Sequence, residues 1–336
     1  MNPPAGQRFA FRPELVLEVQ GSKSALAHFA AEYGAAEVKG ALGDPSVRVR
    51  FGADEPQPGI GVVDGRYKTV RWRIFLSSPD ARVLNASINI SGGPTSFGFS
   101  LLQGFFVEPL LALAAARVQH VLLPAAAVEL DGKAVLVLGR SRSGKSSVCA
   151  RALAAGRHVL GDDHVLVDEH ATIFPFPRRL RLYSDLPITA PEAYRSLTRT
   201  QRGALLARKL VRRATRGYVA PPLRVQPADL GGSPAEPLPL ERIVVVEHGD
   251  GSDVKENELD LDSLVPLAMQ VLQEQRMALA AANADWRQAS NAASADEARL
   301  LRAAFVQTPA QRIAIPRGFD AARAVETLAD RIGIGP

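Results

Sequence analysis

The chain has 336 residues, enough for two ordinary domains, and 46% of them are apolar, which indicates folded cores rather than disorder. Its formal net charge is +5, and its single cysteine, Cys149, excludes an intramolecular disulfide. The N-terminal segment MNPPAGQRFAFRPE lacks the apolar core of a signal peptide, and the cysteine usage fits a reducing compartment, so we expect a cytoplasmic protein.

The first hundred or so residues predict a separate α+β unit, which we place at residues 1–105. Polar and apolar residues alternate in three segments, and this period is typical of half-buried antiparallel strands: 47–51, 67–75 and 83–90. Asp64-Gly65 has the composition of a turn, and residues 24–33 favour a short helix.

The most apolar stretch of the chain covers residues 97–116. Gln103, Glu108 and Pro109 interrupt it, so an uninterrupted hydrophobic span is absent. We predict a buried helix with Pro109 near its start, and no membrane span.

A hairpin and a glycine-rich loop follow. Asp131-Gly132 is a two-residue turn between the apolar runs VEL and KAVLVL. The second run leads into a complete G-x-x-x-x-G-K-S loop at residues 139–146, and residues 146–155 favour a helix. This strand–loop–helix context is what the nucleotide-binding P-loop motif requires.

The P-loop motif carries its own chemistry. Backbone N–H groups of the loop and of the helix N-terminus point at phosphate oxygens. Lys145 is expected to reach the β- and γ-phosphates, and the Ser146 hydroxyl is expected to ligate Mg²⁺. We therefore predict that ATP and Mg²⁺ bind at the residues of this loop. They are Gly139, Arg140, Ser141, Arg142, Ser143, Gly144, Lys145, Ser146 and Ser147.

Two adjacent carboxylates, Asp162 and Asp163, end the next short apolar strand, residues 158–160. A strand at this place can return its end to the phosphate site. One carboxylate can then hold Mg²⁺, and the other can orient or deprotonate an attacking hydroxyl. We assign the metal to Asp163, together with Ser146, and the acceptor to Asp162, although the pattern leaves this order open. A solvated Asp-Asp turn is the alternative.

Residues 128–181 resemble the catalytic domain of HPr kinase/phosphorylase and its relatives, among them kinases associated with lasso-peptide biosynthesis. The matching segments are VELDGKAVLVLGRSRSGKSSVCARALAAGRHVLGDDHVLVD and IFPFPRRLRL. In that family a hairpin leads into the P-loop, and the strand after the next helix ends in an Asp pair. A Pro/Arg segment then lies close to the phosphates, and its counterparts here are Arg178, Arg179 and Arg181.

The resemblance implies an α/β fold in which residues 106–336 form a P-loop kinase core like that of ATP-dependent phosphoenolpyruvate carboxykinase. It implies an ATP-dependent kinase that phosphorylates a serine hydroxyl of a protein or peptide, and it implies a homo-oligomer. The three arginines would stabilise charge on the transferred phosphoryl group. The N-terminal unit has no phosphate-binding motif, so we expect it to recognise the acceptor.

Two departures separate the chain from the bacterial HPr enzymes. Pro124 stands where relatives often carry a histidine, and the Glu-containing RGLGI-type signature has no clean match. HPr itself is therefore not implied as the acceptor. Two other functions fit the same motifs: a small-molecule kinase on the same core, and a nucleotide-binding regulator with little catalysis.

A basic segment follows the Arg cluster. No acidic residue occurs between Glu192 and Asp229, and residues 201–216 favour a basic helix that attracts anions. This helix could cover ATP, hold an acidic peptide, lie free in solvent, or touch a membrane interface through the short apolar face of residues 204–211. No nucleic-acid-binding motif accompanies the charge, so no nucleic acid partner is expected.

The remaining elements complete the predicted core. Prolines between residues 221 and 239 predict an exposed loop. Apolar strands are expected at 241–246 and 311–315, and helices are expected at 264–282, 295–305 and 319–332.

Overall fold

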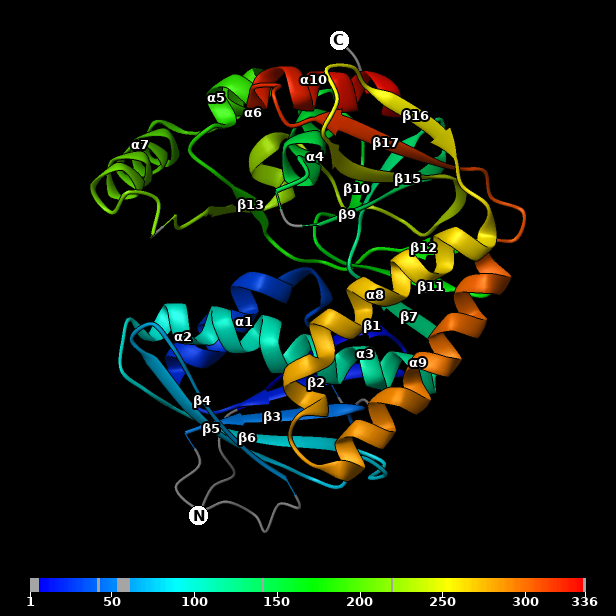
Figure 1. Cartoon of the computed structure of the whole chain (residues 1–336). Coiled ribbons are helices and arrows are strands. Elements are labelled where there is room, and N and C mark those ends of the chain that lie inside the picture. Colours follow the sequence, from blue (N-terminus) through cyan, green and yellow to red (C-terminus); the bar gives the residue numbers. More distant parts are fainter. Residues whose placement is uncertain (1–5, 41–42, 53–60, 141, 219, 335–336) are drawn as a thin grey trace. The chain divides into compact units, whose positions relative to one another are not determined.

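The computed structural model of the chain describes residues 6–40, 43–52, 61–140, 142–218 and 220–334. The protein is mixed α/β and divides into two units (Figure 1). One comprises Met1–Leu122 and Pro266–Arg302, and the other comprises Leu123–Val265 and Ala303–Pro336. The chain thus passes from the second unit back to the first at residue 266 and returns to the second at residue 303.

The first unit is built on a six-stranded mixed sheet in the order β1-β2-β3-β6-β5-β4. The strands are β1 (Gly6–Arg12), β2 (Leu15–Gln20), β3 (Val47–Phe51), β4 (Gly61–Tyr67), β5 (Val70–Leu76) and β6 (Leu84–Ser91). In β3 the alternation correctly places Val47, Val49 and Phe51 inside. The expected antiparallel pairing of β3 is wrong, because β3 runs parallel to both β2 and β6. Alternation reports one buried face and not the direction of the partner strand.

The predicted turn at Asp64-Gly65 is also wrong, because both residues lie inside β4. Gly65 is opposite Trp72, and a Cβ there would lie 2.3 Å from the indole ring. The glycine therefore makes room for a ring rather than for a bend. The chain reverses at Lys68 and Thr69, and Lys68 has a φ of 55°.

The first unit also contains helices, and its first three α-helices contact this sheet. The helices are α1 (Lys23–Tyr33), the short 3₁₀ turn η1 (Gly34–Ala36), α2 (Thr95–Leu102), the π-helical turn η2 (Gln103–Val107) and α3 (Glu108–Arg117), followed late in the chain by α8 (Leu261–Ala280) and α9 (Ala284–Phe305). Pro109 lies in the first turn of α3, as predicted. Among the described residues, one helical stretch, Thr95–Arg117, is long and apolar enough to cross a membrane, and 83% of its apolar window is buried within the fold.

The polar residues that interrupt this stretch have partners inside the first unit. The Gln103 amide Nε2 donates to the Tyr33 hydroxyl at 2.9 Å and to Glu108 Oε1 at 3.0 Å. Since buried polar groups are costly unless they are hydrogen-bonded, this network explains how a core helix tolerates them.

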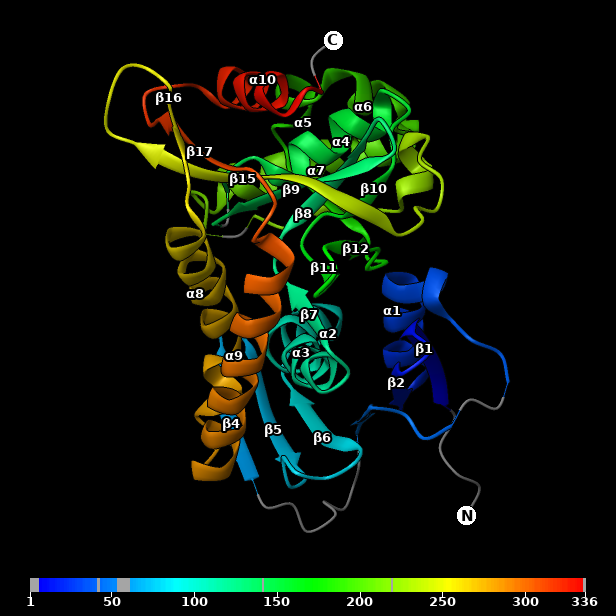
Figure 2. The same ribbon diagram turned by 90° about the vertical axis from the view of Figure 1, so that its right-hand side faces the viewer.

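Helices α8 and α9 run side by side in both views (Figures 1 and 2). Between them, Arg276 holds Glu297 through two hydrogen bonds of 2.8 and 2.6 Å, and both side chains are buried. The indole Nε1 of Trp286 donates to the carbonyl oxygen of Ser77 at 3.2 Å, which attaches α9 to the first unit.

This division differs from the boundary predicted at residue 105. Helix α3 belongs to the first unit because it packs on β2 and β3, and residues 266–302 belong there as well. Helical periodicity indicates that one face of α8 and α9 is buried, but it does not indicate which sheet buries that face.

The second unit contains a mixed sheet with strands in the order β10-β8-β9-β15-β12-β11, and β17 and β16 extend it beside β15. The strands are β7 (His120–Leu123) at the unit boundary, β8 (Ala126–Leu130), β9 (Lys133–Gly139), β10 (Val159–Gly161), β11 (Val165–Asp168), β12 (Thr172–Phe174), β15 (Leu238–Gly249), β16 (Lys255–Glu258) and β17 (Ala310–Pro316). The predicted β8–β9 hairpin is confirmed, and its turn residues Asp131 and Gly132 have φ values of 50° and 78°. Positive φ at both positions is what a type I′ turn requires.

The helices of the second unit include α4 (Lys145–Ala154) and α10 (Ala321–Ile332), which lie on the same side of the sheet in both views (Figures 1 and 2). Val148 of α4 and Leu328 of α10 share one apolar core with Val137 of β9 and Val246 of β15. The other elements are α5 (Leu186–Thr189), α6 (Pro191–Ser196), α7 (Arg199–Ala214) and the 3₁₀ turn η3 (Pro227–Leu230). The segment predicted as a proline-rich loop contains β14 (Leu223–Val225), which pairs with β13 (Leu180–Leu182).

Candidate functional site

The predicted P-loop connects the end of β9 to the start of α4, and its two glycines are required by the geometry. A Cβ on Gly139 would lie 2.7 Å from the Ser143 Oγ atom and 3.0 Å from the Val246 carbonyl oxygen. Gly144 precedes α4 with a φ of 93°, a left-handed conformation that glycine adopts without strain. Arg142 has a φ of 71°, which is unusual for a residue with a side chain.

Lys145 lies inside this loop. Its Nζ atom donates to the carbonyl oxygens of Gly139 and Arg140 at 2.5 and 3.1 Å, and it is 3.4 Å from the Ser143 Oγ atom. Burial lowers the pKa of the Lys145 ammonium, although the nearby charges of Asp163 and Asp162 oppose this shift. The lysine is thus held by neutral carbonyl groups, beside two carboxylates.

Asp162 occupies a buried position after β10. Gly161 makes the bend possible, because a Cβ there would lie 1.9 Å from the His164 carbonyl oxygen. The side chain is 4% exposed, and burial, followed by the charge of Asp163, raises the pKa of Asp162 to about 7. The nearby Ser146 side chain opposes this shift. The Oδ2 atom accepts the Arg181 backbone N–H at 3.3 Å, and Oδ1 has no hydrogen-bond partner among the described residues.

Asp163 is more open, and two arginines flank it. Its Oδ2 atom lies 3.4 Å from the Arg178 guanidinium and 3.3 Å from that of Arg181. The Arg178 side chain is buried, and its terminal nitrogen is 3.3 Å from the Nδ1 atom of His164. Asp162 is therefore the inner, buried carboxylate of the pair, and Asp163 is the outer one, with two arginines beside it.

Backbone contacts explain why the Pro/Arg segment comes so close to the aspartates. The Phe176 N–H donates to the Leu160 carbonyl oxygen at 3.0 Å, which ties residues 175–179 to β10. The Phe176 ring is 1% exposed and packs 5.8 Å from the His164 ring. From this anchor the chain continues into β13, which carries Arg181.

The structure thus brings together Lys145, Ser146, Asp162 and Asp163 with Arg178 and Arg181. Arg179 lies between the two arginines in the chain and is half-buried. Arg140 and Arg142 are exposed on the loop, and Ser141 lies outside the described residues. The Ser147 Oγ atom hydrogen-bonds the Thr189 Oγ1 atom at 3.2 Å, so this serine faces α5.

Sequence reasoning missed two residues near this cluster. Burial and the charges of Asp163 and Asp162 raise the pKa of the Tyr183 phenol, which also lies within the field of Arg142. Thr189 accepts the Arg151 Nε–H at 2.7 Å through its carbonyl oxygen and so joins α5 to α4. Neither belongs to a known motif. The only signal for Tyr183 is its place at the end of the LRLY segment, directly after Arg181 and Leu182 of the Arg cluster.

The residues present fit a magnesium ion. Mg²⁺ is usually held by one or two carboxylates and completes its octahedron with waters and substrate phosphates. The Ser146 hydroxyl lies near the Asp162 carboxylate and lowers its pKa, and Asp162 Oδ1 is a buried oxygen without a partner among the described residues. No group of three or more His, Cys, Asp or Glu side chains forms a metal-binding cluster in the described part of the chain. The protein therefore offers few oxygen ligands here, as expected for a magnesium ion that a phosphate ligand also coordinates.

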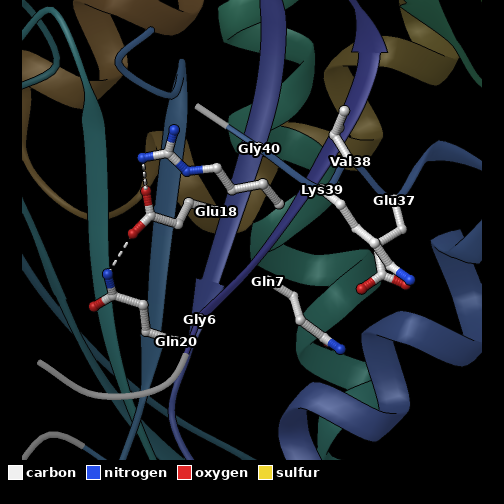
Figure 3. A pocket seen from close by; sticks show the side chains of 9 residues that line it. Gly6, Gln7, Glu18, Gln20, Glu37, Val38, Lys39 and Gly40 are labelled. Carbon is white, nitrogen blue, oxygen red and sulfur yellow. Dashed lines mark hydrogen bonds and ion pairs between the residues drawn. The ribbon is translucent and has the colours of Figure 1, made fainter. Parts of the chain in front are cut away.

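A second candidate site is a cavity of about 460 Å³ in the first unit (Figure 3). Glu18 is its most buried charged residue, and the carboxylate pairs with Arg8 at 2.9 Å and Arg48 at 3.4 Å and accepts a hydrogen bond from Gln20. Its charge is thus satisfied within the fold, so the P-loop remains the stronger candidate. The lining residues are Gly6, Gln7, Arg8, Glu18, Gln20, Glu37, Val38, Lys39 and Gly40.

No protein-family model matches this chain, and no curated protein matches it either. The resemblance to HPr kinases therefore rests on the residues of the P-loop, the Asp pair and the Pro/Arg segment.

Proposed function

We propose that this chain is an ATP-dependent kinase of the HPr-kinase-like group, with a core like that of phosphoenolpyruvate carboxykinase, that transfers the γ-phosphoryl group to a serine hydroxyl of a protein or peptide. One observation carries the proposal: the P-loop lysine and serine lie beside an aspartate pair whose outer member is flanked by two arginines. Phosphoryl transfer depends on such positioning and on charge stabilisation.

Each group in the cluster has a role in this chemistry. Lys145 would exchange its carbonyl partners for phosphate oxygens, to which a charged donor binds more strongly. Arg178 and Arg181 would stabilise negative charge on the group in transfer. When bound, Mg²⁺ would neutralise charge on the phosphate oxygens.

The contacts favour one order of the aspartates. Ser146, the P-loop residue expected to ligate Mg²⁺, lies close enough to Asp162 to lower the pKa of that carboxyl, so we propose that Asp162 holds the metal with it. Asp163 is 28% exposed at its side chain, so it is the carboxylate that an acceptor hydroxyl can reach. We propose that Asp163 orients or deprotonates that hydroxyl, which exchanges the roles that we assigned from the sequence.

The proposal is tested by phosphoryl transfer from γ-labelled ATP to an array of serine-containing peptides, with a matched array in which alanine replaces each serine. We expect Mg²⁺-dependent label on serine peptides alone, and loss of label for the Asp163→Asn variant. Label on free hydroxylated metabolites and not on peptides would indicate a small-molecule kinase. Nucleotide binding without any transfer would support the regulator.

A further inference from the structure

Helix α7 presents an unusual surface at the outer edge of the second unit (Figure 1). It begins at a capping box, in which Thr198 accepts the Gln201 N–H at 3.2 Å while Gln201 accepts the Thr198 N–H at 2.9 Å. Leu205 is the one residue of the helix that is fully buried, and it belongs to the core of the second unit. The helix is thus capped and attached along one side only.

The opposite side of α7 is apolar at its centre. Leu206 and Leu210 are each 59% exposed, and Val211 is 42% exposed. Residues four positions apart lie on the same face of a helix, so the two leucines form one ridge. Side chains exposed by more than half stand on a crest rather than in a groove. A partner that buries this ridge must therefore close around it.

Cations surround the ridge. Arg199 and Arg213 lie seven positions before Leu206 and three positions after Leu210, which places them on the same line of the helix. Together with Lys209, which lies between them on the neighbouring line, they are exposed, and none of these three pairs with an acidic side chain in the described part of the chain. Arg212 and Arg216 are exposed as well, but Arg212 lies on another face of the helix and Arg216 lies beyond its end. Arg202 and Arg208 instead donate to backbone carbonyls and hold the helix in place. The cations around the ridge are therefore available to an anionic partner.

We propose that α7 binds the surface of an anionic lipid bilayer, with Leu206 and Leu210 inserted between the headgroups and the surrounding cations on their phosphates. Interfacial helices have this composition, with basic residues around a narrow apolar face. Each cation near an anionic surface adds attraction, which salt screens. This function is independent of the proposed kinase activity.

Other occupants fit the surface less well. A second α7 would bring like charges together, which disfavours pairing of two copies through this helix. The most acidic exposed strand of the second unit, β16, carries Glu256, which is already paired with Arg331 at 2.8 Å, and its four exposed residues KENE have no apolar group to receive the leucines. An acidic protein partner would have to supply a groove for the crest, whereas a lipid headgroup layer deforms around it.

The test is sedimentation of the full chain with vesicles of phosphatidylcholine alone and of phosphatidylcholine mixed with phosphatidylglycerol. We expect binding to the mixed vesicles only, and weaker binding at high salt. The double variant Leu206→Gln/Leu210→Gln should bind about tenfold or more weakly, because two apolar side chains no longer insert. The triple variant Arg199→Gln/Lys209→Gln/Arg213→Gln should bind about a hundredfold more weakly, because three cations near the ridge are removed.

The matched control is Met277→Gln/Val306→Gln, which removes two other apolar side chains with exposures of 66% and 63%. It should bind like the wild type, and circular dichroism should show all variants folded. Failure of the wild type to bind phosphatidylglycerol vesicles would overturn the proposal, above all if the chain instead bound polyglutamate through α7. Equal binding by the leucine variant and the control would overturn it as well.

Discussion

At the scale of single residues, Lys145 is expected to contribute to ligand binding but little to the stability of the fold. Its ammonium lies among carbonyl oxygens, and burial lowers its pKa, so the fold gains little from this charge. Lys145→Ala should therefore leave the protein folded but weaken Mg·ATP binding by about ten- to hundredfold, as expected when hydrogen bonds to a charged group are lost. Calorimetric titration measures the affinity, and Lys133→Ala, at the exposed start of β9, is the control. An unchanged affinity in the folded Lys145 variant would contradict the assignment of the P-loop.

The Asp162 carboxylate, by contrast, is expected to lower the stability of the metal-free protein while it supports the proposed function. The pKa of Asp162 is raised from 3.8 to about 7, so the native metal-free protein binds more protons than the unfolded chain across this interval. Its free energy of unfolding should consequently fall as pH rises from about 4 to about 7 and then level off, as far as this group decides it. Asp162→Asn removes the charge, so without Mg²⁺ it should be more stable than the wild type by roughly 1–3 kcal/mol at about pH 8, and less so at about pH 5.

The measurement is chemical unfolding of both proteins at the two pH values in the presence of a chelator. The same variant should lose phosphoryl transfer by about two orders of magnitude or more, because a proposed Mg²⁺ ligand is gone. Asp163→Asn is the control, since this more exposed carboxylate should give no comparable gain in stability. A destabilised Asp162 variant at about pH 8 would show that the carboxylate supports the fold rather than the ligand.

The P-loop and the Asp pair could be predicted because each follows from a local pattern. Strand, loop and helix are consecutive, and the loop leaves little room for a Cβ at Gly139 and gives Gly144 a left-handed φ. The order of the aspartates depends on a contact between Ser146 and Asp162, which no spacing reveals. Tyr183 and Thr189 reach the cluster only through the packing of β13 and α5, so the sequence alone did not identify them.

At the scale of elements, the same turn signal was right at one place and wrong at another. Asp131-Gly132 predicted a hairpin because two consecutive positive φ values suit few residue types, and the structure has this hairpin. Asp64-Gly65 has the same composition, but its glycine accommodates Trp72 from the neighbouring strand. A cross-strand contact thus overrode a turn signal, and only the tertiary structure distinguishes the two cases.

Helix α7 depends on its cap more than most helices do, because it is buried at one residue alone. Thr198→Ala removes the side-chain acceptor of the capping box and should cost about 1 kcal/mol of helix stability. We expect faster amide exchange in the first turn of α7, with no change in the exchange of α4. Thr200→Ala is the control, because this exposed threonine lies inside the same turn and takes no part in the cap. Equal exchange in the two variants would show that the cap does not hold the helix.

At the scale of the whole molecule, each of the two units is formed by two separate segments of the chain. The residues that we propose to bind the nucleotide all lie in the second unit, whereas residues 266–302 leave it as a helical hairpin that belongs to the first unit. The sequence predicted two domains but divided them at a single point, since a pattern of elements does not show that the chain returns. The grouping of α8 and α9 depends on contacts such as that of Trp286 with Ser77.

This division predicts how the chain can be cut. A protein that joins residues 123–265 to 303–336 through a short Gly/Ser linker should fold and bind Mg·ATP about as well as the full chain, because it retains the whole core around the P-loop. A fragment of residues 106–336 should aggregate, because it keeps α8 and α9 but lacks the sheet that buries Trp286, which is 0% exposed in the full chain. Gel filtration and calorimetry compare the two. If the 106–336 fragment were monomeric and bound Mg·ATP while the joined protein did not fold, the helical hairpin would belong with the nucleotide-binding unit after all.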